Sequence, residues 1–241
     1  MQRYFGRNIN EQIILDEEDI FHITKVMRCK VGSQIEIVIN NIVYLGVINS
    51  LNPFAVSIEN ELKNSRNVEL DVKVNLYYCL PKGDKMDLVI QKCTELGVNS
   101  IFGVRSSRCI AKIENDKKKS KIDRFNKIMK EASEQSHRTE IPHFIDVIDY
   151  TNLKDCKEDY KFIAYELEAG NKNLLLTDLK NIKKGSSIAI LIGSEGGFST
   201  EEVKMANDWG FKNVSLGRRI LRSETAAMYL MSVISFIRES N

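Results

Sequence analysis

Two glycine-rich segments near the C-terminus each join a short apolar run to a predicted helix. The first reads Ile-Gly-Ser-Glu-Gly-Gly-Phe-Ser over residues 192–199, and the second reads Leu-Gly-Arg-Arg-Ile-Leu-Arg-Ser-Glu over residues 216–224. When a strand runs directly into a helix in an α/β protein, the connecting loop places backbone N–H groups over the carboxyl edge of the sheet, where ligands bind. Two such loops, separated by one predicted helix, predict a ligand site at the edge of a largely parallel sheet.

The remaining pattern divides the chain of 241 residues near residue 70. Turn residues at short intervals between β-branched runs predict a small β-barrel over residues 1–70, with one helix that begins in the acidic run at 16–19. Strands and helices then alternate, which predicts a parallel α/β domain over residues 72–241. The predicted strands lie at residues 13–15, 34–39, 42–48, 54–59, 72–78, 101–104, 162–165, 187–192 and 214–216.

Capping residues predict where the helices of the second domain begin. Asp84 and Ser223 each precede an apolar helical pattern, and Ser199 with Glu202 has the spacing of a capping box. A polar helix is expected over residues 122–138. In the first domain, the spacing of apolar residues predicts a helix face that contains Ile20, Ile23, Val26 and Met27.

Composition argues against several classes of protein. No apolar stretch reaches the ~18–20 residues that cross a bilayer, and the first residues lack the apolar segment of a secretory signal, so we expect a cytoplasmic protein without a membrane partner. The 5 cysteines and 3 histidines are scattered, with no C-x-x-C pair. Neither a disulfide framework nor a metal site is therefore expected.

The net charge of +2 conceals a basic middle region. Residues 71–140 contain 15 Lys and Arg against 10 Asp and Glu, a surplus of 5. A local surplus of this kind favours contact with nucleic-acid phosphates even in a nearly neutral protein. The run Lys117–Lys119 is, however, equally typical of a solvated helix start.

The composition of the two glycine-rich loops limits their ligand. Neither a G-x-x-x-x-G-K-[ST] phosphate loop nor a G-x-G-x-x-G dinucleotide loop is present, and the Glu195 carboxylate would repel a phosphate group. Gly193, Gly196 and Gly197 allow the backbone to turn sharply or approach a ligand closely. A neutral or cationic ligand with an adenine ring, such as S-adenosylmethionine with its sulfonium, fits these features. The alternative is two tight strand-to-helix turns without a ligand.

The loops also carry a resemblance to a known family. Together with the segments Val26–Arg28, Lys82–Asp87, Gln91–Val98 and Glu134–Arg138, they resemble the signature of the SPOUT superfamily of RNA methyltransferases. Within that superfamily, the chain is similar over nearly its whole length to the enzymes that methylate ring N3 of a uridine in small-subunit (16S) ribosomal RNA.

The resemblance implies a fold, a cofactor and partners. It implies an N-terminal PUA-like β-barrel that binds RNA, a C-terminal α/β knot that holds S-adenosyl-L-methionine, a homodimer, and the RNA of the small ribosomal subunit (30S particle) as substrate, with no metal. Two departures are visible. Ser194 stands where the family has proline, and the segment Tyr165–Gly170 fits the equivalent family loop only approximately.

The resemblance also implies a cofactor site made mostly of backbone groups, in which Glu195 either contacts the cofactor or stabilises its own loop. The implied residues are Leu191, Ile192, Gly193, Glu195, Gly196, Gly197, Leu216, Gly217, Ile220, Leu221, Thr225 and Ala226.

Two residues at the start of the last predicted helix are candidates for catalysis. Uridine N3 carries a proton that must leave, so the site must stabilise an anionic uracil or supply a base. Arg222 stays protonated and could hold negative charge on a uracil oxygen, helped by the helix N-terminus. Glu224 is a candidate base or an orienter of Arg222. Alternatively, Glu224 is a first-turn partner of the helix dipole, with Arg222 as its ion pair.

Basic side chains outside the loops are candidate ligands of RNA phosphates, although each could also be a surface cation without a partner. The candidates are Arg3, Arg7, Lys25, Arg28, Lys82, Lys85, Arg105, Arg108 and Arg138.

Three other functions compete with the uridine N3 methyltransferase. A SPOUT enzyme that acts on another RNA position, such as a ribose 2′-O, is disfavoured by Lys82–Asp87 and Gln91–Val98. A non-catalytic RNA-binding protein with the same knot is disfavoured by the intact glycines and by residues 222–225. A nucleoside triphosphatase fits least, because the phosphate-loop lysine is missing.

Overall fold

The computed structural model describes residues 1–63, 68–111, 113, 115–165 and 175–240. Contacts divide it into two units, Met1–Glu69 with Ser133–Ile141, and Leu70–Ala132 with Pro142–Asn241. The sequence pattern predicts one domain over residues 72–241, whereas Ser133–Ile141 groups with the first unit. The reason is a set of hydrogen bonds within that unit: Arg138 and the backbone N–H of Thr139 both donate to the Glu69 carboxylate.

The first unit is a curved five-stranded sheet in the order β2-β1-β3-β4-β5. Its turn between β3 and β4 is made by Asn40 and Asn41, whose φ angles of 51° and 65° are typical of a tight hairpin. Tyr4, Ile23 and Ile37 are fully buried in its core. The elements are β1 (Arg3–Ile9), β2 (Gln12–Leu15), α1 (Glu17–Phe21), η1 (His22–Val26), β3 (Gln34–Ile39), β4 (Ile42–Leu51) and β5 (Phe54–Glu61).

Two features of this unit differ from the prediction. β1 was not predicted, because its polar residues hide the alternation; it pairs parallel to β3. The predicted apolar helix face is wrong at Val26 and Met27, which are exposed, while Ile23 is buried. The helix widens to π spacing here, since the Met27 N–H donates to the His22 carbonyl at 2.8 Å, and this turns those two side chains away from the core.

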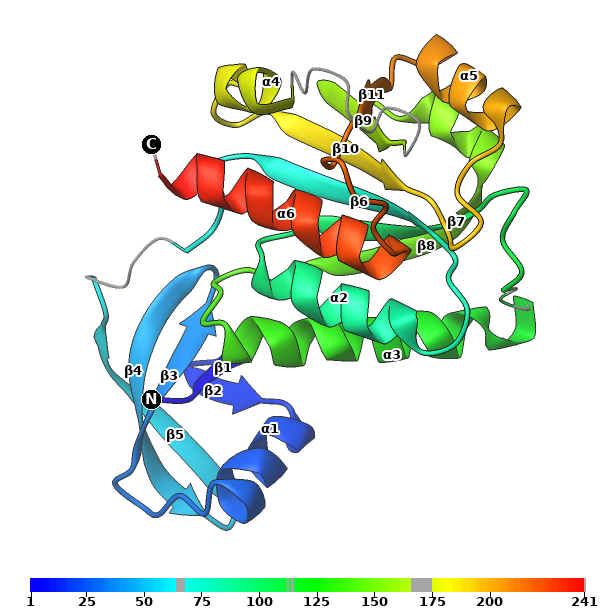
Figure 1. Ribbon diagram of the computed structural model, residues 1–241. Helices are drawn as coiled ribbons and strands as arrows, with labels where there is room; N and C mark the ends of the chain where they lie inside the picture. Colours follow the sequence, from blue (N-terminus) through cyan, green and yellow to red (C-terminus); the bar gives the residue numbers. More distant parts are fainter. Residues whose placement is uncertain (64–67, 112, 114, 166–174, 241) are drawn as a thin grey trace. The chain divides into compact units, whose positions relative to one another are not determined.

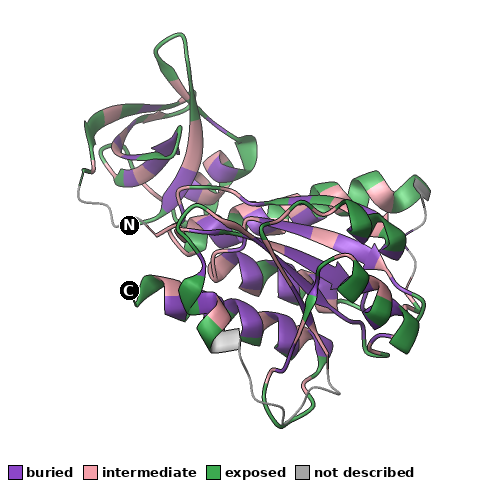
Figure 2. Cartoon of the chain, turned by 90° about the horizontal axis from the view of Figure 1, so that it is seen from above, coloured by how far each residue is buried: buried purple, intermediate pink, exposed green. Residues whose placement is uncertain are grey.

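The second unit is a six-stranded parallel sheet in the order β11-β9-β10-β6-β7-β8, with helices on both faces (Figure 1). Helices α2 and α6 lie side by side on one face, where α3 and α4 also pack, while η2 and α5 cover part of the other. Figure 2 shows the strands buried between these layers. The elements are β6 (Lys73–Cys79), α2 (Lys85–Glu95), β7 (Ser100–Arg105), α3 (Asn115–Gln135), β8 (His143–Asp149), η2 (Tyr150–Asp155), β9 (Tyr160–Ala164), α4 (Leu175–Asn181), β10 (Ser187–Ile192), α5 (Thr200–Asp208), β11 (Lys212–Val214) and α6 (Ser223–Glu239).

The predicted capping residues have three different outcomes. The capping box of α5 is confirmed, with reciprocal bonds between Ser199 and Glu202 at 3.1 and 2.9 Å. Asp84 occupies the N-cap position of α2 without a side-chain capping bond. Ser223 does not cap α6, because the helix begins at Ser223 itself and Arg222 is the N-cap residue. The Ser223 hydroxyl instead accepts a hydrogen bond from Tyr78 at 3.0 Å.

The C-terminal end of α6 is held beside the start of strand β6 by Arg238, whose side chain is buried. Arg238 donates to both oxygens of Asp71, each at 2.7 Å, and to the carbonyl of Ile182 at 2.9 Å. Its hydrogen bonds, above all, hold the pKa of the Asp71 carboxyl below its ordinary value. The pair therefore stabilises the fold fully above pH ~4, and this contribution is lost as the pH falls through the lower folded-state pKa.

We expect Arg238→Ala to lower the free energy of unfolding by about 2–4 kcal/mol, because it leaves a partly buried carboxylate without its partner. Lys184→Ala is the matched control: Lys184 is exposed and lies 3.9 Å from Asp71, so its loss should change stability by less than about 0.5 kcal/mol. Urea unfolding at pH 7 measures both values. Equal stability of the two variants would contradict the assigned role of Arg238.

Candidate functional site

Three loops of the second unit converge at the carboxyl edge of its sheet. They follow β6, β10 and β11 and cover residues 80–84, 193–199 and 215–222; the end of β9, at Ala164 and Tyr165, lies beside them. These strands occupy neighbouring places in the sheet, so parallel pairing brings the loops together. Two adjoining hollows result.

The larger hollow, of about 520 Å³, lies between the first glycine loop and the N-terminus of α6. The smaller hollow, of about 60 Å³, lies beneath the segment that follows β11. They share Ala164, Ile220, Leu221 and Ala226, so one elongated ligand could occupy both. The larger is lined in addition by Lys85, Ile192, Gly193, Ser194, Glu195, Gly196, Gly197, Phe198, Arg222 and Ser223, and the smaller by Tyr165, Ser215, Leu216, Gly217 and Arg219.

Two glycines suit the backbone of these loops. A Cβ on Gly193 would lie 3.2 Å from the Cα of Gly197, so a side chain there would crowd the neighbouring backbone. Gly217 has φ of 108°, a conformation that L-residues rarely adopt. At these two positions the main chain itself forms part of the wall of each hollow.

A cluster of charged side chains stands at the edge of the larger hollow. The Lys85 ammonium lies 2.8 Å from Glu195 and 3.4 Å from Glu224. Its hydrogen bond with Glu195 is the main reason that the pKa of Lys85 is raised. Burial alone would raise the pKa of both Glu195 and Glu224, but hydrogen bonds from Lys85 and from backbone N–H groups outweigh it, so both pKa values are lowered. These three side chains together carry a net charge of −1, and the Arg222 guanidinium, which lines the same hollow, adds a positive charge.

The candidate catalytic residues differ in their surroundings. Arg222 is exposed and lines the larger hollow. Within the described residues, the ion pair of Glu224 is with Lys85 and not with Arg222, and Glu224 also accepts a hydrogen bond from Ser223 at 3.2 Å. The lowered pKa makes Glu224 a weak base. The geometry therefore favours charge stabilisation by Arg222 over proton removal by Glu224.

Ten of the twelve predicted cofactor residues line one of the two hollows; Leu191 and Thr225 line neither. Leu191 lies within the central strand β10, paired with β6 and β9, and its side chain is buried against the opposite face of the sheet. Thr225 is exposed on α6. Three lining residues, Ala164, Phe198 and Ser215, are not predicted to contact the cofactor, because nothing in the sequence pattern distinguishes them. Of the segment 165–170, only Tyr165 lies within the described residues.

Three of the predicted RNA ligands make ion pairs with carboxylates of the protein. Arg3 is buried and pairs with Glu36 at 2.7 Å. Arg138 is buried and pairs with Glu69 at 2.6 Å. Lys85 is bound by two carboxylates, as described above.

The other predicted RNA ligands differ in how freely their side chains can reach an RNA phosphate. Lys25, Arg28 and Lys82 are exposed. Three others make surface contacts: Arg7 pairs with Asp16, Arg105 pairs with Asp149, and Arg108 donates to the carbonyl of Gly196 at 2.9 Å.

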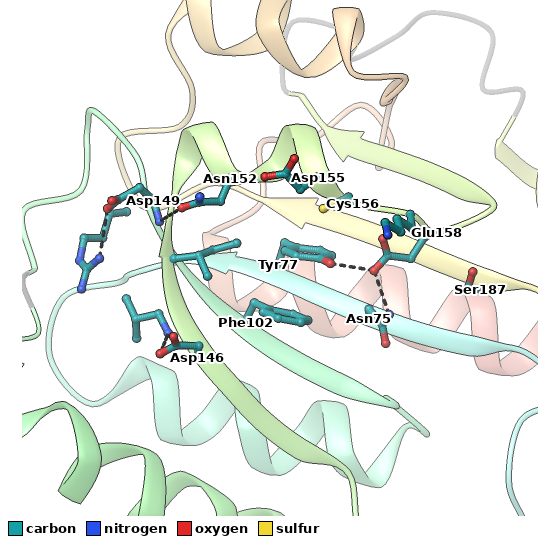
Figure 3. Close-up of a pocket in the computed structure, with 14 residues that line it drawn as sticks. Asn75, Tyr77, Phe102, Asp146, Asp149, Asn152, Asp155, Cys156, Glu158 and Ser187 are labelled. Carbon is teal, nitrogen blue, oxygen red and sulfur yellow. Dashed lines mark hydrogen bonds and ion pairs between the residues drawn. The ribbon is translucent and has the colours of Figure 1, made fainter.

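A groove of about 750 Å³, separate from the two hollows, lies on the sheet face opposite α2 and α6 (Figure 3). Its floor contains Tyr77 and Phe102, whose rings stack with centroids 4.7 Å apart, and Tyr77 and Asn75 both donate to Glu158, at 2.7 and 2.9 Å. None of the predicted cofactor residues lines it. Its ionisable lining residues are mostly acidic, namely Asp146, Asp149, Asp155 and Glu158 against Arg105 and Lys157.

The described residues contain no group of three or more His, Cys, Asp or Glu side chains placed to hold a metal ion. The same residues contain no helix with the length and apolar character needed to cross a membrane.

Comparison with known proteins gives matches over both units. A family model described as an RNA methyltransferase domain matches residues 68–235, and one described as an RNA methyltransferase PUA domain matches residues 15–59. Ribosomal RNA small subunit methyltransferase E of Bacillus subtilis is 35% identical over 250 aligned residues, which cover 99% of this chain and 98% of that protein.

Two solved structures are similar in fold and contain a ligand. Ribosomal RNA small subunit methyltransferase E from Neisseria gonorrhoeae, bound to S-adenosyl methionine, has a TM-score of 0.82 at 25% identity and covers 98% of each chain. A protein of Legionella pneumophila in complex with the bound cofactor SAM has a TM-score of 0.84 at 28% identity, over 97% of this chain and 96% of that one.

Proposed function

The chain belongs to the family of RNA methyltransferases that includes ribosomal RNA small subunit methyltransferase E, and we propose that it methylates ring N3 of a uridine in 16S ribosomal RNA, with S-adenosylmethionine as methyl donor. The observation that carries this proposal is the pair of adjoining hollows walled by glycine-rich main chain, with an anionic cluster at the edge. Because its proposed substrate is ribosomal, we assign its activity to the cytoplasm.

The residues around the hollows fit this donor. Gly193 and Gly217 place main chain without side chains at the walls of the two hollows, which lets an adenine ring and its ribose approach the backbone closely. The Glu195 carboxylate, which lines the larger hollow, is complementary to a sulfonium. When bound, S-adenosylmethionine supplies an electrophilic methyl group.

The chain's own part in the chemistry is to bind and stabilise a uracil that loses its N3 proton. Arg222 stays protonated, lines the larger hollow and lies at the N-terminus of α6, so both its guanidinium and the helix end can stabilise negative charge on a uracil oxygen. Glu224 stays a carboxylate because its pKa is lowered, and it is therefore unsuited to hold the N3 proton. The proton passes to solvent.

We propose that the first unit, part of which matches the PUA model, contacts the RNA backbone. Arg7, Lys25 and Arg28 are exposed on it and can approach phosphates. Lys82 and Arg108 are exposed near the donor site in the second unit and supply further positive charge.

We also propose that the chain forms a knot and a homodimer. In support of the knot, the segment after β11 lies against the ends of β9 and β10, and α6 then packs on α2. In support of the dimer, α6 exposes Tyr229 and Phe236, seven residues apart and hence on one face of the helix. Sedimentation of the purified protein tests the dimer.

The proposed function is tested by incubating the protein and labelled S-adenosylmethionine with small ribosomal subunits, and separately with free 16S RNA, from cells that lack the modification. Mass spectrometry of the digested RNA should find one methyl group on the base of a single uridine, with a fragmentation pattern that identifies N3. A methyl group on a ribose 2′-oxygen, or on a different base, would refute the proposal.

A further inference from the structure

Lys85 connects three chain segments around the larger hollow. It is the first residue of α2, and its ammonium contacts Glu195 of the first glycine loop at 2.8 Å and Glu224 of the first turn of α6 at 3.4 Å. The Glu195 oxygen that Lys85 binds also accepts a hydrogen bond from the backbone N–H of Lys82 at 3.2 Å. The loop after β6, the first glycine loop and α6 are thus joined at one nitrogen.

We infer that Lys85 is a positioning residue of the donor site: it holds Glu195 and Glu224 together and so sets the glycine loop and the first turn of α6, with Arg222, in the geometry required for methyl transfer. This inference rests on the proposed function. It assigns Lys85 to the active site rather than to contact with RNA.

The position of Lys85 in its own helix supports this assignment. A cation in the first turn of a helix opposes the helix dipole, so Lys85 does not stabilise α2. The residue before the N-cap, Gly83, has φ of 64°, so the loop turns sharply just before the helix. Lys85 is therefore placed for its contacts outside α2.

The Lys85 ammonium offsets the repulsion between the carboxylates of Glu195 and Glu224. Glu224 is nearly buried, with 12% of its side chain exposed, and Glu195 lies beside it at the same nitrogen. Without Lys85, two like charges would face each other in a partly desolvated space and would move apart. Because Arg222 lies two residues before Glu224, a shift of this helix turn would displace its guanidinium.

The same contacts argue against a phosphate as the partner of Lys85. Its single positive charge is already matched by two negative ones, and a third anion would meet a cluster of net charge −1. Lys82, which is exposed, remains the candidate for RNA contact in this loop.

The test uses Lys85→Met, Lys85→Arg and, as a matched control, Lys92→Met, which removes a lysine paired with Glu95 on the same helix. Lys85→Met should lower kcat by about 10- to 100-fold, because a small displacement of a reacting group costs this much. It should also weaken donor binding several-fold in calorimetry, and leave the affinity for RNA and its salt dependence unchanged. Lys85→Arg should recover most of both losses, since a guanidinium can bridge two carboxylates. Lys92→Met should match the wild type.

A double-mutant cycle gives a second readout that does not depend on turnover. Glu224→Gln should weaken donor binding in the wild-type background and have little further effect in Lys85→Met, because the two side chains act as one unit. Where Lys85→Met folds poorly, Lys85→Gln, which also removes the charge but keeps a polar side chain, takes its place in the cycle. Equal effects of Glu224→Gln in both backgrounds would overturn the inference.

Two further outcomes would also overturn it: wild-type kinetics and donor affinity in Lys85→Met, or a loss confined to RNA affinity and its salt dependence with kcat unchanged at saturating RNA. Failure of the proposed function would give a different result from failure of this inference. In that case the wild-type protein binds the donor but modifies another position, and the donor-affinity cycle still tests Lys85.

Discussion

Replacing Arg222 by alanine is expected to lower kcat by about 100- to 1,000-fold, the usual effect of removing one preorganised group that stabilises a developing anion. The affinity for S-adenosylmethionine should change by less than about threefold, because main-chain groups account for most of the donor site. The structure gives Arg222 no scaffold role among the described residues: it is exposed, it lines the larger hollow and it makes no ion pair with Glu224.

The measurement is a single-turnover rate with saturating donor and RNA, together with calorimetry of donor binding. Arg218→Ala is the control, since Arg218 is also exposed on the same loop but lines neither hollow. Methylation by Arg222→Ala at the wild-type rate would exclude Arg222 from the reaction. A loss of donor affinity as large as the loss of rate would instead make it a structural part of the donor site.

Gly217→Val is expected to weaken donor binding by about 100-fold. A β-branched residue at φ of 108° is strained by about 1–3 kcal/mol, and the chain relieves this strain by changing the path of the residues that wall the smaller hollow. Donor binding then requires these residues to return to their original path, so the strain energy is subtracted from the free energy of binding.

The control for this prediction is Gly210→Val. Gly210 has φ of 88° and, like Gly217, has no neighbour within 4 Å of its ideal Cβ position, but it lies after α5 and lines neither hollow. Both variants should lose similar stability, as shown by their melting temperatures, and only Gly217→Val should lose donor affinity. Similar donor affinities for the two variants would show that the segment after β11 is not part of the donor site.

Much of the donor site could be predicted because its signals are local. A few neighbouring residues are enough to recognise glycines that follow a short apolar strand, or the capping box formed by Ser199 and Glu202. Strand β10 was predicted with its observed bounds. The order of strands in a parallel sheet then brings the two loops together.

The rest depended on contacts between residues far apart in the chain. Arg3, Arg138 and Lys85 look like surface cations in the sequence, and only folding brings them to carboxylates at Glu36, Glu69 and Glu195. The backbone of Leu191, which was predicted to contact the donor, is paired with the neighbouring strands β6 and β9.

The central claim is that glycine-lined main chain at the carboxyl edge of the sheet binds the methyl donor. Titration of the purified wild-type protein with S-adenosylmethionine in a calorimeter tests it most directly. We expect saturable binding with one donor per chain, greatly weakened in Gly217→Val and retained in Arg222→Ala. Absence of binding to the folded wild-type protein, or undiminished binding to Gly217→Val, would contradict the claim.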